Sequence, residues 1–269
     1  MALTSAPHDA NQTGYATAGA AWNDGPMLAY RPLARHLLDR CPVPLPGVCA
    51  LDAGAGTGGV TELLRGAGAF AVAVDLEPDM LRFARGRDDP VSATVAGDVT
   101  ALPFPAGSFD VAVAAFVLNH LADPATGVRE LARVCRRDGV LLASTFAVER
   151  ADAKNLVDEV ASRHGWHAPE WYRTFHERAR QIGTVSRLID VAASCGLRSI
   201  DVAEDTVDVG LDDAELVCRY RLGMPQFAAF LAGLDPTARA RLHRDVVDRL
   251  GADMPPCRPS VITLCCRVP

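Results

Sequence analysis

The sequence contains a single lysine, Lys154, and only 6% aromatic residues, although 49% of its 269 residues are hydrophobic. No apolar run approaches the roughly 20 residues that a membrane-spanning helix needs. Residues 1–13 lack the positive and then apolar pattern of a signal peptide. We therefore expect a cytoplasmic globular protein with no membrane partner.

An excess of positive charge is also missing. Lysine and arginine together number 27 against 33 acidic residues, which gives a net charge of -6. Proteins that bind nucleic acid usually present a basic patch or stripe to the phosphate backbone, and this sequence has none. We therefore expect no nucleic-acid partner.

The eight cysteines lack the spacings of a metal site. None forms a CxxC pair, and no cluster of cysteine and histidine has zinc-finger spacing. Adjacent Cys265 and Cys266 would point to opposite faces of a strand, so they should not bridge each other. We expect no metal, and reduced cysteines that pack as small hydrophobic side chains.

Short apolar runs alternate with helical patterns between residues 48 and 146. A helical stripe of Val128, Leu131, Ala132 and Cys135 is followed by Gly139, which should end that helix. Strands that alternate with helices imply parallel pairing, with helices on both faces of the sheet. The strands predicted here are Val48–Asp52, Phe70–Asp75, Val91–Ala96, Phe109–Phe116 and Val140–Phe146.

The rest of the chain extends this core. A second helical stripe near residues 185–192 precedes a strand at about 198–209, and Val261–Val268 forms a last strand. We predict one α/β domain with a Rossmann-like, mostly parallel sheet sandwiched by helices. A helical cap would come from insertions after the fifth strand and before the last one. The core would comprise about residues 43–146, 184–210 and 259–269, and the cap about 1–40, 147–183 and 211–256.

A glycine-rich segment, LDAGAGTGG at residues 51–59, follows the first predicted strand and opens a helix. Glycine allows a sharp turn and a close approach to a ligand, and a helix N-terminus offers free N–H groups. Gly54, Gly56 and Gly59 satisfy the dinucleotide pattern GxGxxG, whereas Gly54, Gly56 and Gly58 satisfy GxGxG. The spacing of the glycines alone leaves the cofactor open.

Two carboxylates beside the glycines favour one cofactor. Asp52 precedes Gly54 by two residues, where a carboxylate would repel a pyrophosphate but suits an ammonium or a sulfonium. Asp75 ends the next predicted strand, where it can accept hydrogen bonds from ribose hydroxyls. The pair therefore favours S-adenosylmethionine over NAD.

Four segments within residues 48–146 resemble, in order, the motifs of class I S-adenosylmethionine-dependent methyltransferases. They are LDAGAGTGG, VDLEPDML, AGDVTALPFPAGSFDVAVAAFVLNHLADP and ELARVCRRDGVLLAS. The sequence is most similar to the small-molecule branch that includes ubiquinone- and menaquinone-biosynthesis methyltransferases. The resemblance implies an enzyme that methylates a small molecule. We expect a reaction of bacterial secondary or quinone metabolism, with an oxygen or nitrogen acceptor slightly ahead of a carbon acceptor.

The resemblance also implies roles for ten residues in binding the cofactor. The residues that would line its methionine portion are Asp52, Gly54, Gly56, Gly58 and Phe116. Those that would bind its adenosine portion are Asp75 at the ribose, Leu76 and Met80 on the adenine faces, and Asp98 and Val99 at the adenine amino group. Without the resemblance, Met80 would be a core residue and Asp98 a turn residue.

Few catalytic side chains are needed, because methyl transfer depends mainly on positioning the acceptor against the methyl group. His120 follows Phe116 by four residues, and its ordinary pKa suits a general base; the alternative is a structural role in the loop. The N-terminal segment of this family often folds over the cofactor. Tyr15 would then contact the methionine end or the acceptor, or pack in a lid. Arg31 would pair with the cofactor carboxylate, or with solvent.

The segment RHGWHAPEWYRTFH, residues 163–176, gathers aromatic residues and histidines in a chain that is otherwise poor in aromatics. A flat aromatic or polyketide-like acceptor could stack against it, although ordinary packing would explain it equally. Its three histidines do not have the HxxxH spacing of a helical zinc site.

Other classes of function remain open, because a fold does not fix a reaction. The main alternative is an S-adenosylmethionine-binding enzyme that catalyses another reaction, such as a cyclisation. A non-catalytic binding protein is a further one. An NAD-dependent oxidoreductase is disfavoured by Asp52 and by the segment GDVTALPF. The sequence does not fix the oligomeric state.

Overall fold

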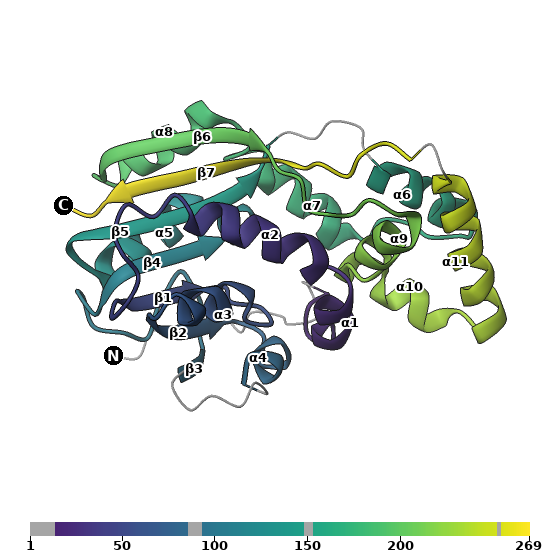
Figure 1. Ribbon diagram of the computed structural model, residues 1–269, viewed down its shortest axis with the longest axis horizontal. Coiled ribbons are helices and arrows are strands. Elements are labelled where there is room, and N and C mark those ends of the chain that lie inside the picture. Colours follow the sequence, from purple (N-terminus) through teal and green to yellow (C-terminus); the bar gives the residue numbers. More distant parts are fainter. Residues whose placement is uncertain (1–13, 86–92, 148–152, 252–253) are drawn as a thin grey trace.

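A twisted β-sheet forms the centre of the computed structural model, which describes residues 14–85, 93–147, 153–251 and 254–269. The described residues form a seven-stranded sheet in the order β3-β2-β1-β4-β5-β7-β6. Figure 1 shows helices on both faces of this sheet and a group of helices beyond one of its ends. The predicted Rossmann-like fold is confirmed. The strands are β1 (Cys49–Ala53), β2 (Phe70–Asp75), β3 (Ala93–Ala96), β4 (Phe109–Ala115), β5 (Cys135–Phe146), β6 (Arg198–Thr206) and β7 (Ser260–Arg267).

The first five strands run parallel, and only β7 is antiparallel to its neighbours β5 and β6. Strand β1 pairs with β2 on one side and with β4 on the other, so the chain order changes direction at β1. In open α/β sheets, ligands bind at the carboxyl ends of the strands beside such a change. This topology places the loops after β1, β2 and β4 at one edge.

Two layers of helices bury the sheet. The helices α2 (Met27–Leu38) and α3 (Gly59–Gly66) lie in front of the sheet in Figure 1, and α5 (Pro124–Val134) and α8 (Val185–Ser194) lie behind it. Leu37 and Leu64 pack with Val113 in the front layer, and Leu131 and Leu188 pack in the rear layer. Both faces of the central strands are therefore buried, which explains their nearly continuous apolar runs.

One predicted boundary is wrong. Helix α5 ends at Val134, and Cys135 is already the first residue of β5, which continues through Gly139. Cys135 pairs with Phe109, and the register then shifts before the next pair. A Cβ on Gly139 would lie 2.8 Å from the carbonyl oxygen of Arg136. Gly139 therefore permits a tight bend within the strand, rather than ending the helix.

Most of the helices after β5 form the cap seen on the right of Figure 1. It consists of α6 (Ala153–Arg163), α7 (Glu170–Ala179), α9 (Ala214–Leu222), the short 3-10 turn η3 (Pro225–Phe227), α10 (Ala228–Gly233) and α11 (Pro236–Leu250). At its centre, Trp166 stacks on the fully buried Phe227 with ring centroids 4.5 Å apart. These rings belong to an apolar cluster that the cap shares with Trp22, Met80 and Phe116. Among the residues that the structure describes, no helix combines the length and apolar character needed to cross a bilayer.

Candidate cofactor and acceptor site

The glycine-rich loop after β1 adopts a conformation that side chains rarely tolerate. Gly54, Gly56 and Gly58 have φ angles of 73°, 55° and 86°, all in the left-handed region. A Cβ on Gly54 would lie 2.2 Å from Cγ2 of Val117, because this loop touches the segment after β4. By contrast, a Cβ on Gly56 would have Met80 Cε at 3.5 Å as its nearest neighbour. Gly54 therefore permits close packing, and Gly56 borders a more open space.

Asp75, at the carboxyl end of β2, lies directly against this loop. Its Oδ2 accepts a hydrogen bond of 2.7 Å from the Gly56 N–H, and its Oδ1 accepts one of 2.9 Å from the Glu77 N–H. Burial raises the pKa of the Asp75 carboxyl, while these two N–H donors act in the opposite direction. Each carboxylate oxygen can accept a second hydrogen bond, so Asp75 retains acceptor capacity for a diol.

Asp52, two residues before Gly54, is buried in the protein interior. The residue is only 1% exposed, and its Oδ2 accepts hydrogen bonds from the Thr61 backbone N–H at 2.8 Å and from the Thr61 hydroxyl at 2.6 Å. Burial raises the pKa of Asp52 to about 7. Asp52 therefore fixes the first turn of α3 to β1, a contact that the sequence pattern did not indicate.

The residues expected at the adenine differ in their surroundings. Leu76 follows Asp75 and is 38% exposed, whereas Met80, on α4 (Pro78–Arg85), is 2% exposed and borders the glycine loop. Asp98 Oδ1 accepts hydrogen bonds of 2.8 Å from both the N–H and the hydroxyl of Thr100. Asp98 thus stabilises a local turn through Oδ1, and Val99 after it is buried; their contacts with the adenine stay a prediction. Leu76 offers the exposed apolar face.

Phe116 directly follows β4 and has a positive φ of 58°. This conformation is unfavourable for a bulky side chain, and such outliers concentrate at functional sites. Its ring packs against Tyr30 and Phe146, with centroids 5.2 and 4.5 Å away. Its N–H donates to the carbonyl oxygen of Ser144 on β5. The strained turn holds an aromatic ring at the carboxyl edge of the sheet.

Tyr15 and His120, the two predicted catalytic residues, lie side by side. Their rings meet edge to face with centroids 5.7 Å apart, although 105 positions separate them in the chain. His120 ends the short turn η2 (Leu118–His120), and its other neighbour is the Phe175 ring at 4.6 Å. The Tyr15 ring also packs against the ring of Trp22 in α1 (Gly19–Asp24), with ring centroids 5.5 Å apart. The N-terminal segment, the turn after β4 and helix α7 therefore converge.

Trp22 is a residue of this site to which the sequence analysis gave no role. Its Nε1 would be 3.9 Å from a Cβ on Gly56, so the indole borders the open side of the glycine loop. Helix α1 is held there by the Gly19 N–H, which donates to Asp79 Oδ2 at 3.1 Å. The sequence feature that could have identified Trp22 is the scarcity of tryptophan, which occurs three times in the chain.

The aromatic insert is divided between two environments. On one side of α7, Trp171 and Phe175 approach Tyr15 and His120. The adjacent Tyr172 receives a hydrogen bond of 3.1 Å from the buried Arg221, which forms an ion pair with Asp158. Trp171 and Phe175 therefore contact the two predicted catalytic residues, whereas Tyr172 contributes to packing; stacking of an acceptor on this insert stays a prediction.

Arg31 lies away from these groups. Its guanidinium forms two hydrogen bonds, of 2.9 and 2.7 Å, with the carboxylate of Glu62 on α3. The partners predicted for Arg31 were the cofactor carboxylate or solvent. In the structure its hydrogen-bond partner is Glu62. The ion pair instead joins α2 to α3, next to the helix that begins at the glycine loop.

Protonation of His120 should make the folded protein less stable in acid. Burial, followed by the nearby charge of Arg178, lowers the pKa of His120 from 6.5 to about 4. The unfolded chain therefore binds a proton below about pH 6.5 that the folded chain refuses, so stability falls as the pH drops toward 4. We expect His120→Gln to remove about 1–2 kcal/mol of the loss in unfolding free energy between pH 7 and pH 5.

Urea denaturation at the two pH values measures this difference. His167→Gln, at an exposed position of the same chain, is the matched control and should retain the wild-type dependence. An identical pH dependence for wild type and His120→Gln would show that His120 titrates normally in the folded protein.

Part of the chain matches known proteins in sequence. Residues 51–143 match the protein family described as "Methyltransferase domain". A demethylmenaquinone methyltransferase from Mycolicibacterium vanbaalenii is 42% identical over 102 residues, which cover 38% of this chain and 43% of that protein. A malonyl-[acyl-carrier protein] O-methyltransferase from Serratia marcescens is 37% identical over 117 residues, covering 42% of this chain and 46% of that protein. The chain thus matches less than half the length of these relatives.

Solved structures extend the likeness to most of the chain. A putative methyltransferase from an antibiotic biosynthesis pathway of Anabaena variabilis has a TM-score of 0.62 at 16% identity, over 86% of this chain and 95% of that one. Phosphoethanolamine N-methyltransferase 2 of Haemonchus contortus, in complex with S-adenosyl-L-methionine, has a TM-score of 0.58 at 19% identity, over 88% and 52%. At such identities the likeness concerns the fold. The resemblance to S-adenosylmethionine-dependent methyltransferases is confirmed for residues 51–143.

Proposed function

We propose that this protein transfers a methyl group from S-adenosylmethionine to a small, flat acceptor, on oxygen or nitrogen. The observation that carries the proposal is Asp75 at the end of β2, hydrogen-bonded to the open glycine loop within a methyltransferase-type core. The relatives named for menaquinone and malonyl-carrier substrates support a small-molecule acceptor. We place the reaction in bacterial secondary or quinone metabolism.

The described residues fit this cofactor. A Cβ on Gly56 would make only ordinary contacts, with Met80 and Trp22, and the hydroxyl of the neighbouring Thr57 is buried with no hydrogen-bond partner among the described residues. A buried hydroxyl without a partner is unfavourable, so a polar ligand at the loop would satisfy it. Asp75 would hold the ribose hydroxyls, and the exposed Leu76 would cover one adenine face. Phe116 would flank the methionine portion.

S-adenosylmethionine supplies an electrophilic methyl group on a sulfonium, and the protein supplies position and a dry environment. Tyr15, Trp22, Trp171 and Phe175 would cover the acceptor and exclude water. His120 is neutral at pH 7 because its pKa is lowered to about 4, so its ring has a free lone pair to receive the acceptor proton. A base of such low pKa accelerates proton transfer only modestly, and positioning would provide the larger part of the rate.

Calorimetric titration with S-adenosylmethionine, S-adenosylhomocysteine and NAD tests the cofactor assignment. We expect micromolar binding of the first two ligands and none of NAD. Transfer of a labelled methyl group to a panel of hydroquinones, phenols and aromatic amines then tests the reaction. Binding of NAD alone would refute the proposal, and cofactor binding with consumption of a polyene but no labelled product would favour a cyclisation.

A further inference from the structure

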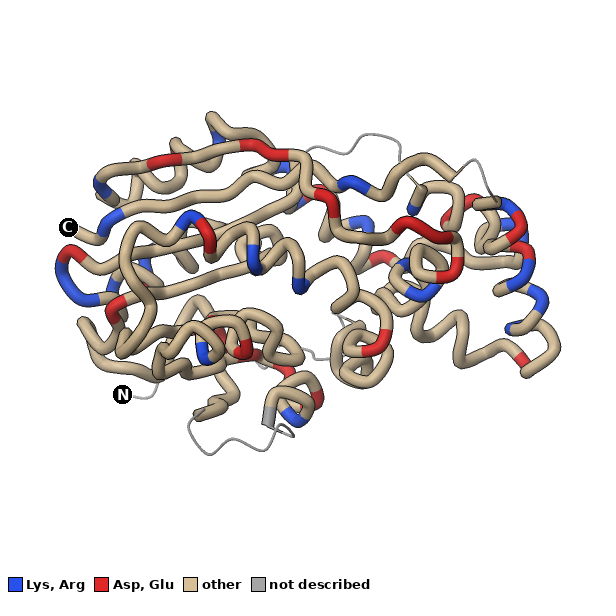
Figure 2. Tube along the Cα trace, viewed as in Figure 1, with Lys and Arg blue, Asp and Glu red and all other residues tan. Residues whose placement is uncertain are grey.

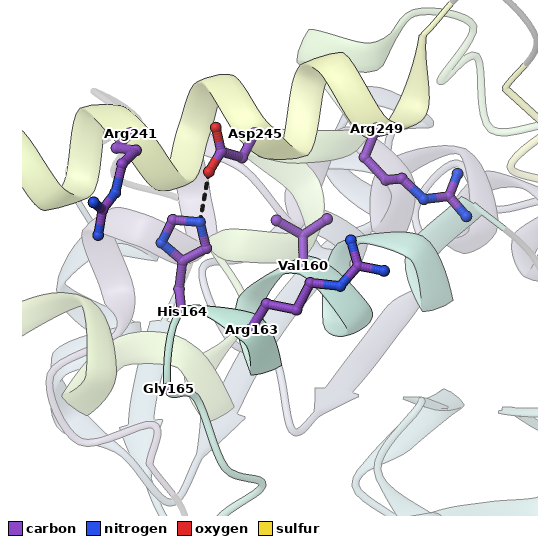
Figure 3. A pocket seen from close by; sticks show the side chains of 7 residues that line it. All are labelled: Val160, Arg163, His164, Gly165, Arg241, Asp245 and Arg249. Atoms are coloured by element: carbon purple, nitrogen blue, oxygen red, sulfur yellow. Dashed lines mark hydrogen bonds and ion pairs between the residues drawn. The ribbon is translucent and has the colours of Figure 1, made fainter.

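A crevice of about 680 Å³ lies in the cap between the end of α6 and the side of α11, formed by residues outside the cofactor site. Figure 3 shows Arg241, Asp245 and Arg249 projecting from the same side of α11, with Arg163 and His164 facing them from the end of α6. The three residues of α11 are spaced four apart, so they form one row along the helix. The side chains of this row line one wall of the crevice.

Positive charge exceeds negative charge around this crevice. Glu159 is shared by two arginines: it pairs with Arg163 and, at 3.5 Å, with Arg249. Asp245 is held by the His164 ring at 2.8 Å, and no ion pair or hydrogen bond joins Arg241 to another described residue. Three guanidinium groups therefore face two carboxylates, and two of these guanidinium groups share the single carboxylate of Glu159.

This local excess contrasts with the rest of the chain. Helix α11 carries four arginines against two aspartates, a net charge of +2, whereas the whole chain has a net charge of -6. Figure 2 shows these basic positions in blue along α11. The side chains of Arg163 and Arg249 are 63% and 42% exposed, so their guanidinium groups remain accessible to a ligand.

We propose that the crevice between α6 and α11 binds a phosphate or diphosphate group of a larger metabolite. A guanidinium group presents a planar fork of N–H donors, and each fork engages two oxygens of an anion. A carboxylate has only two oxygens and satisfies one such fork, whereas a diphosphate has enough oxygens for the forks of Arg163, Arg241 and Arg249. The volume exceeds that of one phosphate, so the remainder of the metabolite would lie against Val160 and the His164 ring.

Titration of the full chain with pyrophosphate at low ionic strength tests this site. We expect saturable binding with one site per chain that weakens as salt is added, because exposed charges are screened. Arg241→Gln should weaken pyrophosphate binding at least about tenfold, since a hydrogen bond to a charged group contributes roughly 1.5–3 kcal/mol. Arg244→Gln, an exposed arginine of α11 that does not line the crevice, is the matched control and should stay within about twofold of wild type.

Three further measurements separate this proposal from its competitors. Pyrophosphate affinity should be unchanged when the protein is saturated with S-adenosylhomocysteine; competition would place the anion at the cofactor site and refute the proposal. Tighter binding of citrate than of pyrophosphate would refute the assignment to phosphate. ADP binding at least as tight as that of pyrophosphate would identify an esterified diphosphate as the ligand. Equal losses in Arg241→Gln and Arg244→Gln would show diffuse attraction rather than a site.

Discussion

Asp75→Ala should weaken the binding of S-adenosylmethionine and S-adenosylhomocysteine at least about 100-fold. Two ribose hydroxyls would lose a charged acceptor, and each such hydrogen bond contributes roughly 1.5–3 kcal/mol. The Gly56 N–H would lose its 2.7 Å acceptor at the same time, which loosens the loop that lines the site. Titration calorimetry with S-adenosylhomocysteine measures the affinity directly.

Two comparisons make this result specific. Asp201→Ala removes an exposed carboxylate of β6 that pairs with Arg40, and we expect it to leave cofactor affinity unchanged. Asp75→Asn keeps one oxygen acceptor and should lose less affinity than Asp75→Ala. Thermal unfolding of each variant reports whether the fold survives. Wild-type affinity in a folded Asp75→Ala protein would refute the assignment of the ribose site to β2.

Gly54→Ala and Gly56→Ala should fail in different ways, although the two glycines are two residues apart. A Cβ on Gly54 would lie 2.2 Å from Val117 Cγ2, in a residue whose φ is already 73°. The left-handed conformation costs about 1–2 kcal/mol for a residue with a Cβ, and overpacking adds about 1–3 kcal/mol. We therefore expect Gly54→Ala to lower the free energy of unfolding by about 3 kcal/mol, measured by urea denaturation.

For Gly56→Ala, the nearest atom to the new Cβ is 3.5 Å away, which is an ordinary contact. Only the backbone term should reduce stability, by about 1–2 kcal/mol. The methyl group would occupy the space beside Met80 and Trp22, so binding of S-adenosylhomocysteine should fall by at least about tenfold while the protein remains folded. The main readout is thus stability for Gly54 and affinity for Gly56.

The control for the first of these variants is Val117→Ala, which removes the methyl groups that a Cβ on Gly54 would meet. In the double variant Gly54→Ala/Val117→Ala we expect recovery of the part of the loss that is due to the clash. The part due to the left-handed backbone should remain. Strictly additive losses would mean that the loops after β1 and β4 do not touch in solution.

The sequence by itself determined the central sheet and the edge of it at which the glycine loop and Asp75 lie. Parallel strands buried on both faces need continuous apolar runs, and the glycine loop and Asp75 lie at strand ends, so local pattern fixed their positions. The predicted bounds of β1, β2 and β4 are therefore close to the observed ones. The start of β5 was not, because a bend at Gly139 and a register shift depend on the neighbouring strand.

Only the tertiary structure decided what surrounds the predicted catalytic residues. Tyr15, His120 and Phe175 belong to three separate segments, and no periodicity in the sequence predicts that their rings meet. The hydrogen bonds from Thr61 to Asp52 Oδ2 were likewise not indicated by the sequence, while the role of Asp52 at the cofactor stays a prediction. Hydrophobic patterning specifies which faces are buried, because it repeats with the period of each element. The partners of a polar or aromatic group depend on contacts between elements distant in the chain, which that period does not encode.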